Sequence, residues 1–358
     1  MSNIFWKGKR VLITGHTGFK GSWLSLWLHH LDAAVFGYSF SVPTKPSLFQ
    51  LCNLSLITET TFADIRDLNQ LMAILDRVRP EIVFHMAAQA LVRRSYIDPL
   101  ETYSTNIMGT VHLMEAVRRT AGVKAVVIVT SDKCYENREW IWGYRENDLL
   151  GGFDPYSSSK GCSELITKAY QNSFFSRDEY ARHGTGIASV RAGNVIGGGD
   201  WAEDRLIPDI INSFLQSQPV IIRNPDAVRP WQHVLEPLSG YMDVAERLYN
   251  GEIDYAEPWN FGPSEDDARP VRWIVERLAV LWGKGATWRL DEAKNPHEAN
   301  YLRLDCSKAR NKLKWRPLWD LETALEKIVD WYRSYESNGD MKGKTLEQIQ
   351  EYQKAREE

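Results

Sequence analysis

The stretch Val11-Leu-Ile-Thr-Gly-His-Thr-Gly-Phe-Lys-Gly-Ser-Trp-Leu24 decides how the rest of the chain folds. Apolar β-formers over 11–13 are followed by glycines at Gly15, Gly18 and Gly21, and apolar residues then recur at helical spacing over 24–31. The stretch therefore predicts a strand, a tight turn and a helix. Such a junction binds anions, because glycines let the backbone approach a pyrophosphate and the helix N-terminus presents unpaired N–H groups.

The spacing of these glycines is Gly-x-x-Gly-x-x-Gly, whereas the usual dinucleotide pattern is Gly-x-Gly-x-x-Gly. Taken alone, the glycines also fit a turn that needs them only for its sharpness. The strand before them and the helix after them favour a dinucleotide site.

Composition and charge narrow the class of protein. The chain has 358 residues, of which 43% are hydrophobic and 25% charged, and its net charge is −4. This size predicts one large domain or two linked domains. Since neither the whole chain nor any segment is strongly basic, we expect no nucleic-acid partner.

Cysteine spacing and hydropathy indicate a reducing compartment. The four cysteines are far apart, without a Cys-x-x-Cys pair or a histidine cluster at metal-ligand spacing, so we expect neither a metal site nor a disulfide framework. The N-terminus lacks an apolar signal core, and no stretch reaches the length of a membrane span. These features predict a cytoplasmic protein with reduced thiols and no membrane partner.

Strand and helix patterns alternate through the first half of the chain. Strands are expected over 33–39, 60–64, 80–90 and 124–132, and the last of these is apolar enough to be buried on both faces, as in a parallel sheet. Ligands bind beyond the carboxyl ends of such strands. The second strand ends at Ser39 without the acidic or arginine side chain that separates NAD from NADP, so this position leaves the choice open.

Tyr156 and Lys160 stand one turn apart on a predicted helix that begins at Pro155. A phenol has a pKa near ~10, and a neighbouring ammonium that stabilises its anion makes it a usable base. The alternative is an ordinary pair on a helix surface. The glycine turn and the strand that ends in Thr130-Ser-Asp132 favour the catalytic interpretation.

Together these motifs resemble those of the extended short-chain dehydrogenase/reductases, and within them the nucleotide-sugar 4,6-dehydratases. The resemblance covers about 7–332 and is closest to members that act on CDP-glucose. It rests on Gly15-x-x-Gly18-x-x-Gly21, Asp64-Ile65, His85-Met-Ala-Ala88, Asn106, Tyr156-x-x-x-Lys160 and Arg191-Ala-Gly-Asn-Val-Ile196.

The resemblance implies an α/β fold, a Rossmann-type doubly wound parallel sheet with a smaller, mixed α/β C-terminal substrate domain, and NAD as cofactor. The implied cofactor-binding residues are Gly15, Thr17, Gly18, Phe19, Lys20, Gly21, Asp64, Ile65, Ala87, Ala88, Gln89, Asn106, Thr130, Tyr156 and Lys160. The implied catalytic residues are Tyr156, Lys160, Ser131, Asp132 and Lys133, and the implied substrate ligands are Asn194, Arg205, Arg229, His233 and Tyr301. For Arg205, a surface salt bridge is the alternative.

The reaction implied by the resemblance is oxidation of the sugar at carbon 4, loss of water across carbons 5 and 6, and return of the hydride to carbon 6, which feeds deoxysugar synthesis of the O-antigen type. Asp132 fits the acid that protonates the leaving hydroxyl, which needs a raised pKa. The dTDP-glucose relatives carry Glu where this chain has Lys133. Lys133 is expected either to remove the proton of carbon 5 or to stay charged and stabilise the enolate.

Past Asn194 the alternation fades, which indicates a change of domain. We expect a cofactor domain over 1–196, to which 228–263 returns through a strand at 259–263, and a sugar-nucleotide domain over 197–335 with a short strand at 300–305. A polar tail over 336–358 is either a helix or frayed. The helices near 103–120 and 155–170 form the dimer interface in similar proteins, so a homodimer or homotetramer is expected.

Two competing functions remain at this point. A nucleotide-sugar 4-epimerase needs Tyr156 and Lys160 but gains nothing from an acid and a base at positions 132 and 133. A protein on the same fold that only senses NAD or acts as a scaffold need not keep Tyr156, Lys160 and Asp132 together.

Overall fold

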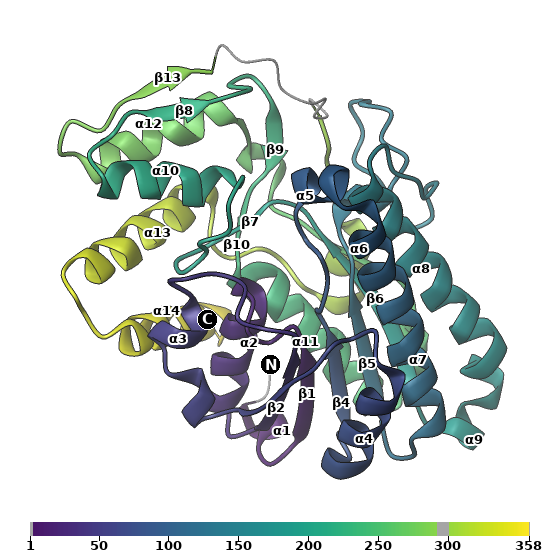
Figure 1. The fold of residues 1–358 in the computed structure, drawn as a ribbon. Helices are drawn as coiled ribbons and strands as arrows, with labels where there is room; N and C mark the ends of the chain where they lie inside the picture. Colours follow the sequence, from purple (N-terminus) through teal and green to yellow (C-terminus); the bar gives the residue numbers. More distant parts are fainter. Residues whose placement is uncertain (1–2, 292–300, 358) are drawn as a thin grey trace.

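The computed structural model describes residues 3–291 and 301–357, which are organised around one parallel sheet (Figure 1). Its seven strands follow the order β11-β6-β5-β4-β1-β2-β3, with every neighbouring pair parallel. The strands are β1 (Arg10–Thr14), β2 (Ala34–Ser39), β3 (Glu59–Phe62), β4 (Ile82–His85), β5 (Ala125–Val129), β6 (Gly186–Ala192) and β11 (Trp259–Phe261). The strand order turns back between β1 and β4, so a ligand crevice lies beyond their carboxyl ends.

Both faces of the sheet are buried, and β1 shows how its sequence achieves this. Val11 and Ile13 belong to the hydrophobic core on one face, whereas Leu12 belongs to the core on the other, since successive side chains of a strand alternate between faces. Helices α2 and α11 pack on the first face, and α4, α7 and α8 on the second (Figure 1). These helices are α2 (Phe19–His30), α4 (Leu68–Val78), α7 (Gly109–Arg119), α8 (Pro155–Phe174) and α11 (Leu235–Tyr249).

A smaller part of the molecule is formed mainly by residues after β6. It contains α10 (Leu206–Leu215), α12 (Val271–Trp282) and α13 (Leu321–Glu336), together with the short strands β7 (Val195–Ile196), β8 (Val220–Ile222), β9 (Val228–Pro230), β10 (Gln232–His233), β12 (Ala268–Pro270) and β13 (Trp288–Leu290). The short strands pair as β7 with β10, β8 with β13 and β9 with β12. This part stands over the carboxyl edge of the sheet in Figure 1.

The C-terminal stretch is a packed helix. Helix α14 (Met341–Glu357) lies against α13 and α2, with Ile349 and Tyr352 fully buried. The Tyr352 hydroxyl donates a hydrogen bond to Glu236 Oε2 on α11 at 2.7 Å. Of the two alternatives for the polar tail, the structure therefore selects the helix.

Other local predictions have mixed outcomes. The strand expected at 259–263 is present as β11, which pairs with β6. The strand expected at 300–305 is wrong for the described residues 301–305, which form only isolated bridges of Tyr301 with Val228 and of Leu304 with Tyr144. The helix expected over 103–120 begins earlier, as α5 (Val92–Ile97), α6 (Pro99–Tyr103) and a π-helical turn (Ser104–Met108) that runs into α7.

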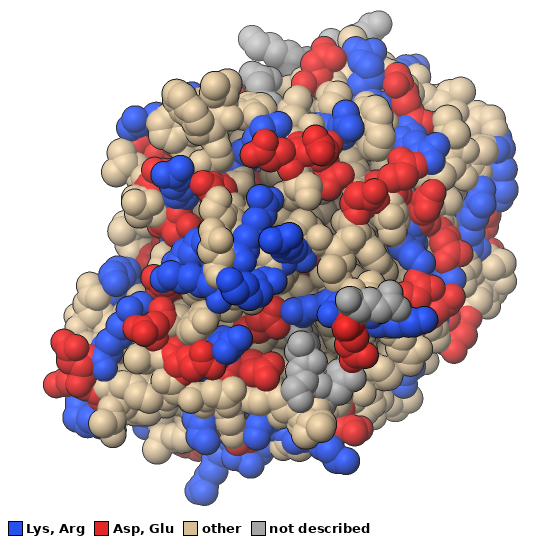
Figure 2. Space-filling model, turned by 180° about the vertical axis from the view of Figure 1, so that it is seen from behind, with Lys and Arg blue, Asp and Glu red and all other residues tan. Residues whose placement is uncertain are grey.

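Surface charge is mixed in sign. Figure 2 shows Lys and Arg gathered around a hollow near the centre of one face, with Asp and Glu close by. Across the described ranges, no helix combines the length and apolar character needed to cross a membrane. In 3–291 and 301–357, no group of His, Cys, Asp and Glu is arranged to hold a metal ion.

Candidate active site

The glycine turn lies at the carboxyl end of β1 and is shaped by close backbone contacts. Gly15 has a φ of +76°, and a Cβ added there would lie 2.7 Å from the backbone nitrogen of Ala87. A Cβ on Gly21 would lie 2.3 Å from the carbonyl oxygen of Gly15. At Gly18, in contrast, a Cβ would meet only the Gly15 oxygen, at 3.4 Å. The turn thus leaves open space beside the first residues of α2.

This open space suits the phosphates of a dinucleotide. Gly18 is the N-cap of α2 and provides no side-chain cap for the first N–H groups of the helix. Uncapped N–H groups at the positive end of a helix dipole bind phosphate. The residues present therefore fit the pyrophosphate of the cofactor that the resemblance implies.

The edges of the cofactor region are held by buried polar contacts. Thr14 Oγ1 accepts hydrogen bonds from the backbone nitrogens of Met86 and Ala87, both at 3.2 Å. Asn106, in the π-helical turn, accepts from Gln89 N at 2.8 Å and donates to Ser159 Oγ at 2.8 Å. These bonds fix the ends of β1 and β4 against α8.

The region that the resemblance assigns to the adenosine contains a charged pair and a buried histidine. Asp64 pairs with Arg66 at 2.6 Å, and this guanidinium lowers the pKa of the carboxyl. At the end of β2, Ser39 Oγ lies 2.8 Å from His16 Nδ1 and accepts from Thr17 N at 3.3 Å. Burial lowers the pKa of His16 to about 4, so its imidazole is neutral at pH 7.

Tyr156 and Lys160 project from the first turns of α8. Asp154 caps this helix by accepting from Ser157 N at 2.9 Å, and Pro155 occupies its first position. Both Tyr156 and Lys160 are buried. Lys160 Nζ donates to the carbonyl oxygen of Val129 at 3.2 Å, and burial lowers its pKa to about 8.

Groups on other elements also act on the pKa of Tyr156. Burial raises the pKa of Tyr156 to about 12, and the groups that oppose this rise are a hydrogen bond with Ser131 and the charge of Arg205. The Lys160 ammonium donates to the Val129 carbonyl of β5. Arg205 is thus a further cation near the phenol, and the role of Lys160 toward Tyr156 stays a prediction.

The turn after β5 carries the other candidate catalytic groups. Ser131 Oγ donates to Asp132 Oδ1 at 3.0 Å and accepts from Lys133 N at 3.2 Å. Asp132 is 3% exposed, and its Oδ2 has no hydrogen-bond partner among the described residues. Burial raises the pKa of this carboxyl, as a proton donor requires.

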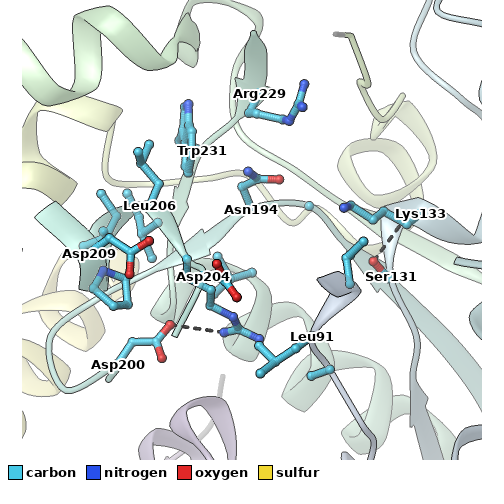
Figure 3. Close-up of a pocket in the computed structure, with 18 of the residues that line it drawn as sticks. Leu91, Ser131, Lys133, Asn194, Asp200, Asp204, Leu206, Asp209, Arg229 and Trp231 are labelled. Atoms are coloured by element: carbon cyan, nitrogen blue, oxygen red, sulfur yellow. Dashed lines mark hydrogen bonds and ion pairs between the residues drawn. The ribbon is translucent and has the colours of Figure 1, made fainter. Parts of the chain in front are cut away.

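A cavity of about 310 Å³ joins this turn to the smaller part of the molecule. Figure 3 shows Lys133 pointing from its turn toward Asn194, with Arg229 on β9 and Trp231 beyond. Candidate residues on its wall are Phe19, Lys20, Thr130, Ser131, Asp132, Lys133, Tyr156, Asn194, Arg205 and Arg229. The cofactor region and the cavity thus share Phe19, Lys20, Thr130 and Tyr156.

Arg205 and Lys20 both line this cavity and interact with other charged groups there. Arg205 Nη1 pairs with Asp200 Oδ2 at 3.1 Å, with the Asp200 side chain 6% exposed. Burial and the charge of Arg205 lower the pKa of Lys20 to about 7. Since Arg205 lines the cavity, the alternative of an ordinary surface salt bridge does not describe it.

The structure does not bring His233 into the cavity. Its side chain is fully buried, with its ring 5.7 Å from that of Trp23 and 4.9 Å from that of Trp319. Burial lowers its pKa to about 3. Trp231 lines the cavity, whereas His233 does not. Because the His233 side chain is enclosed by the core, the predicted ligand role for His233 is not supported.

Tyr301 also lies outside the cavity wall, and its backbone bridges to Val228 beside Arg229. The remaining cofactor candidates lie along the strand ends and helices next to the cavity rather than on its wall: Gly15, Thr17, Gly18, Gly21, Asp64, Ile65, Ala87, Ala88, Gln89, Asn106 and Lys160.

Sequence reasoning missed a charged network on the cavity wall. Asp204 pairs with Arg93 of α5 at 3.3 Å and with Arg223 at 3.2 Å, and Arg223 also pairs with Asp209 at 3.5 Å. Burial raises the pKa of Asp209 to about 6. No spacing rule links positions as distant as 93 and 204, so only the fold reveals this network.

Comparisons with known proteins identify the family of this chain. The family described as GDP-mannose 4,6 dehydratase matches residues 12–328. The CDP-glucose 4,6-dehydratase of Salmonella typhimurium is 58% identical over 351 residues, covering 98% of each chain. The dTDP-glucose 4,6-dehydratase of Streptomyces antibioticus is 28% identical, covering 90% of this chain and 92% of the relative.

Solved structures show the same fold. The dTDP-glucose 4,6-dehydratase of Bacillus anthracis superimposes with a TM-score of 0.74 at 20% identity, covering 94% of this chain and all of that one. The UDP-glucuronic acid 4-epimerase of Bacillus cereus has a TM-score of 0.77 at 24% identity, covering 91% of this chain and 99% of the other. The chain belongs to the GDP-mannose 4,6-dehydratase family of the extended short-chain dehydrogenase/reductases.

Proposed function

We propose that this protein is a CDP-glucose 4,6-dehydratase that uses NAD and forms CDP-4-keto-6-deoxyglucose. The observation that carries the proposal is the convergence of Tyr156, Asp132 and Lys133 on one cavity, in a chain 58% identical over its length to an enzyme of that name. Bound NAD would supply a hydride acceptor for carbon 4 and return the same hydride to carbon 6.

The residues of the chain perform the proton transfers in this proposal. Tyr156 takes the proton of the carbon 4 hydroxyl, with Ser131 orienting that hydroxyl and Arg205 favouring the phenolate. Lys133 takes the proton of carbon 5, which the new ketone has made acidic. Asp132, whose pKa is raised by burial, gives a proton to the hydroxyl that leaves carbon 6 as water.

A substitution of Lys133 tests which group removes the proton of carbon 5. If Lys133 is the base, Lys133→Met abolishes exchange of the carbon 5 hydrogen with deuterated solvent while oxidation at carbon 4 persists. Exchange at the wild-type rate would instead leave Lys133 as a charged group that stabilises the enolate.

The substrate ligands proposed are Asn194, Arg205 and Arg229 from the cavity wall. Arg229 suits the diphosphate, because a planar guanidinium binds phosphate oxygens in pairs. The ends of β1 and β4 are proposed to hold the cofactor, with Gly18 facing its pyrophosphate.

The decisive experiment compares sugar nucleotides. Purified protein with NAD is incubated separately with CDP-glucose, dTDP-glucose, GDP-mannose and UDP-glucose, and the alkali-induced absorbance of a 4-keto-6-deoxy sugar is followed. Product from CDP-glucose is expected, and Tyr156→Phe is the inactive control. Conversion of UDP-glucose to UDP-galactose without any keto product would replace this proposal with a 4-epimerase.

Assembly and location belong to the same proposal. We infer a homodimer or homotetramer that uses α7 and α8, because Leu165 and Phe174 of α8 are 59% and 41% exposed. Light scattering of the purified protein would test this assembly. All four cysteines are free thiols, which suits the cytoplasm, and the division into domains at 196 and 335 stays a prediction.

A further inference from the structure

Glu164 and Arg191 form a buried ion pair to which the proposed reaction gives no role. Glu164 lies on α8 one turn after Lys160, and Arg191 lies on β6. Arg191 Nη2 is 2.8 Å from Glu164 Oε2 and its Nε donates to Oε1 at 2.9 Å, with the two side chains 2% and 3% exposed. This is a two-pronged contact in a dry environment.

The glutamate end of the pair holds the start of the turn after β5. Glu164 accepts a hydrogen bond from Thr130 Oγ1, the residue directly before Ser131. It also accepts from Ser189 Oγ of β6 at 2.6 Å. Both carboxylate oxygens are therefore engaged.

The arginine end holds the other side of the same turn. Arg191 Nη1 donates to the Tyr135 hydroxyl at 2.6 Å, and Tyr135 directly follows Cys134, the last residue of the turn. The Tyr135 hydroxyl in turn donates to Asn260 Oδ1 at 2.8 Å. One ion pair thus contacts the residues on both sides of 131–134.

We propose that the Glu164–Arg191 pair positions the turn 131–134 against α8, so that Asp132 and Lys133 act on the same sugar that Tyr156 and Lys160 hold. This inference rests on the proposed function. Glu164 and Arg191 are positioning residues, because they reach the substrate only through Thr130, Tyr135 and α8.

Stability alone is a weak explanation for such a pair. Replacing a buried ion pair with apolar residues of similar volume is often neutral or stabilising in proteins. A polar network with every member bonded instead fixes one arrangement of the groups that it joins. Here the joined groups are the elimination turn and the helix of the oxidation step.

The inference predicts that the two half-reactions separate when the pair is broken. Oxidation at carbon 4 depends mainly on Tyr156 and the cofactor, which α8 and the glycine turn hold, and uses only Ser131 from the turn 131–134. Elimination depends on Asp132 and Lys133, which the turn holds. If the turn shifts from α8, sugar is oxidised but loses water slowly, and reduced cofactor accumulates during turnover.

The test uses the full-length enzyme with NAD and CDP-glucose. Glu164→Gln is compared with wild type by the steady-state absorbance of reduced cofactor, by keto-sugar formation, and by hydrogen exchange of peptides covering 130–135. We expect product formation to fall about 100-fold, with a larger fraction of reduced cofactor and faster exchange in 130–135.

The matched control is another shielded ion pair far from this turn. Asp243 of α11 pairs with Arg356 of α14 at 2.7 Å, with the side chains 14% and 18% exposed. Asp243→Asn is expected to lower the melting temperature while leaving the reduced-cofactor fraction and the exchange of 130–135 at wild-type values.

Milder variants cover the case in which Glu164→Gln does not fold. Thr130→Val and Tyr135→Phe each remove one contact of the pair with the turn, and each is expected to raise the reduced-cofactor fraction. Equal slowing of oxidation and elimination, or unchanged exchange in 130–135, would overturn the inference. If wild type forms no keto sugar, the proposed function fails, whereas hydrogen exchange still decides whether the pair holds the turn.

Discussion

The cofactor region and the substrate cavity are neighbours, yet they are specified in different ways. At the carboxyl ends of β1 and β4 the shape is set by the backbone, since a Cβ on Gly15 would lie 2.7 Å from Ala87 N. In the cavity the shape is set by charged side chains, some of them from distant segments, as in the Arg93–Asp204 pair. The first region therefore tolerates little added volume, and the second depends on charge.

The largest effect is expected from removing the proton donor of the cavity. Asp132→Asn keeps the size of the side chain but removes the proton donor, so dehydration should fall about 1,000-fold. Turnover with CDP-glucose measures this loss, and binding of NAD is measured separately. Equal loss of NAD affinity would show that the two regions are not specified independently.

Adding one methyl group tests the cofactor region. Gly15→Ala meets the Ala87 backbone at a positive φ, so we expect about 100-fold weaker NAD binding by calorimetry, or about 3 kcal/mol. The control is Gly122→Ala, which has a φ of +94° but no atom within 4 Å of the added Cβ. If Gly122→Ala weakens NAD binding as much as Gly15→Ala does, the loss comes from the strain of a positive φ and not from the contact with Ala87.

Lowering the pH should reduce the stability of the folded protein through protonation of His16. Its pKa is about 4 in the folded protein and 6.5 as its ordinary value, so the unfolded chain takes up a proton first as pH falls. Stability is then lost between pH 6.5 and about 4, by about 3 kcal/mol for this group. Melting temperatures at pH 7 and 5 should differ less in His16→Gln than in wild type, whereas the exposed His30→Gln should behave as wild type.

The smallest effect is expected at the rim of the cavity. Arg93 and Asp204 are 31% and 42% exposed, and exposed pairs contribute under about 1 kcal/mol. Arg93→Met should raise the KM for CDP-glucose about threefold at low salt and less at high salt. Arg94→Met, which loses its pair with Glu101 outside the cavity, is the control, and an equal rise there would remove any special role for the rim.

Local patterns were enough to predict the strand, turn and helix that begin the chain's parallel sheet. The glycines of 15–21 are needed for a tight turn, and the apolar runs are needed for buried strands. Both requirements involve only short stretches of sequence. The seven-stranded parallel sheet and the helix that carries Tyr156 and Lys160 follow from them.

Local patterns were not enough where a residue's role depends on the direction of its side chain or on a partner far away in the sequence. His233 lies in a two-residue strand, whose pattern is too short to tell which side faces the ligand. The pair of Arg93 with Asp204 joins segments that sequence spacing does not connect. Burial raises the pKa of Tyr156, while Ser131 and Arg205 lower it, and none of these is visible in the spacing of Tyr156 and Lys160.

Helix α2 has a consequence for synthesis of the chain. Its Trp23 packs against His233, and its Trp27 packs against Tyr352 of the last helix. At about 10 residues per second, a ribosome makes that tyrosine roughly half a minute after the tryptophan. Helix α2 thus waits for α14, and the nascent chain carries uncovered indole surface until α14 has been translated.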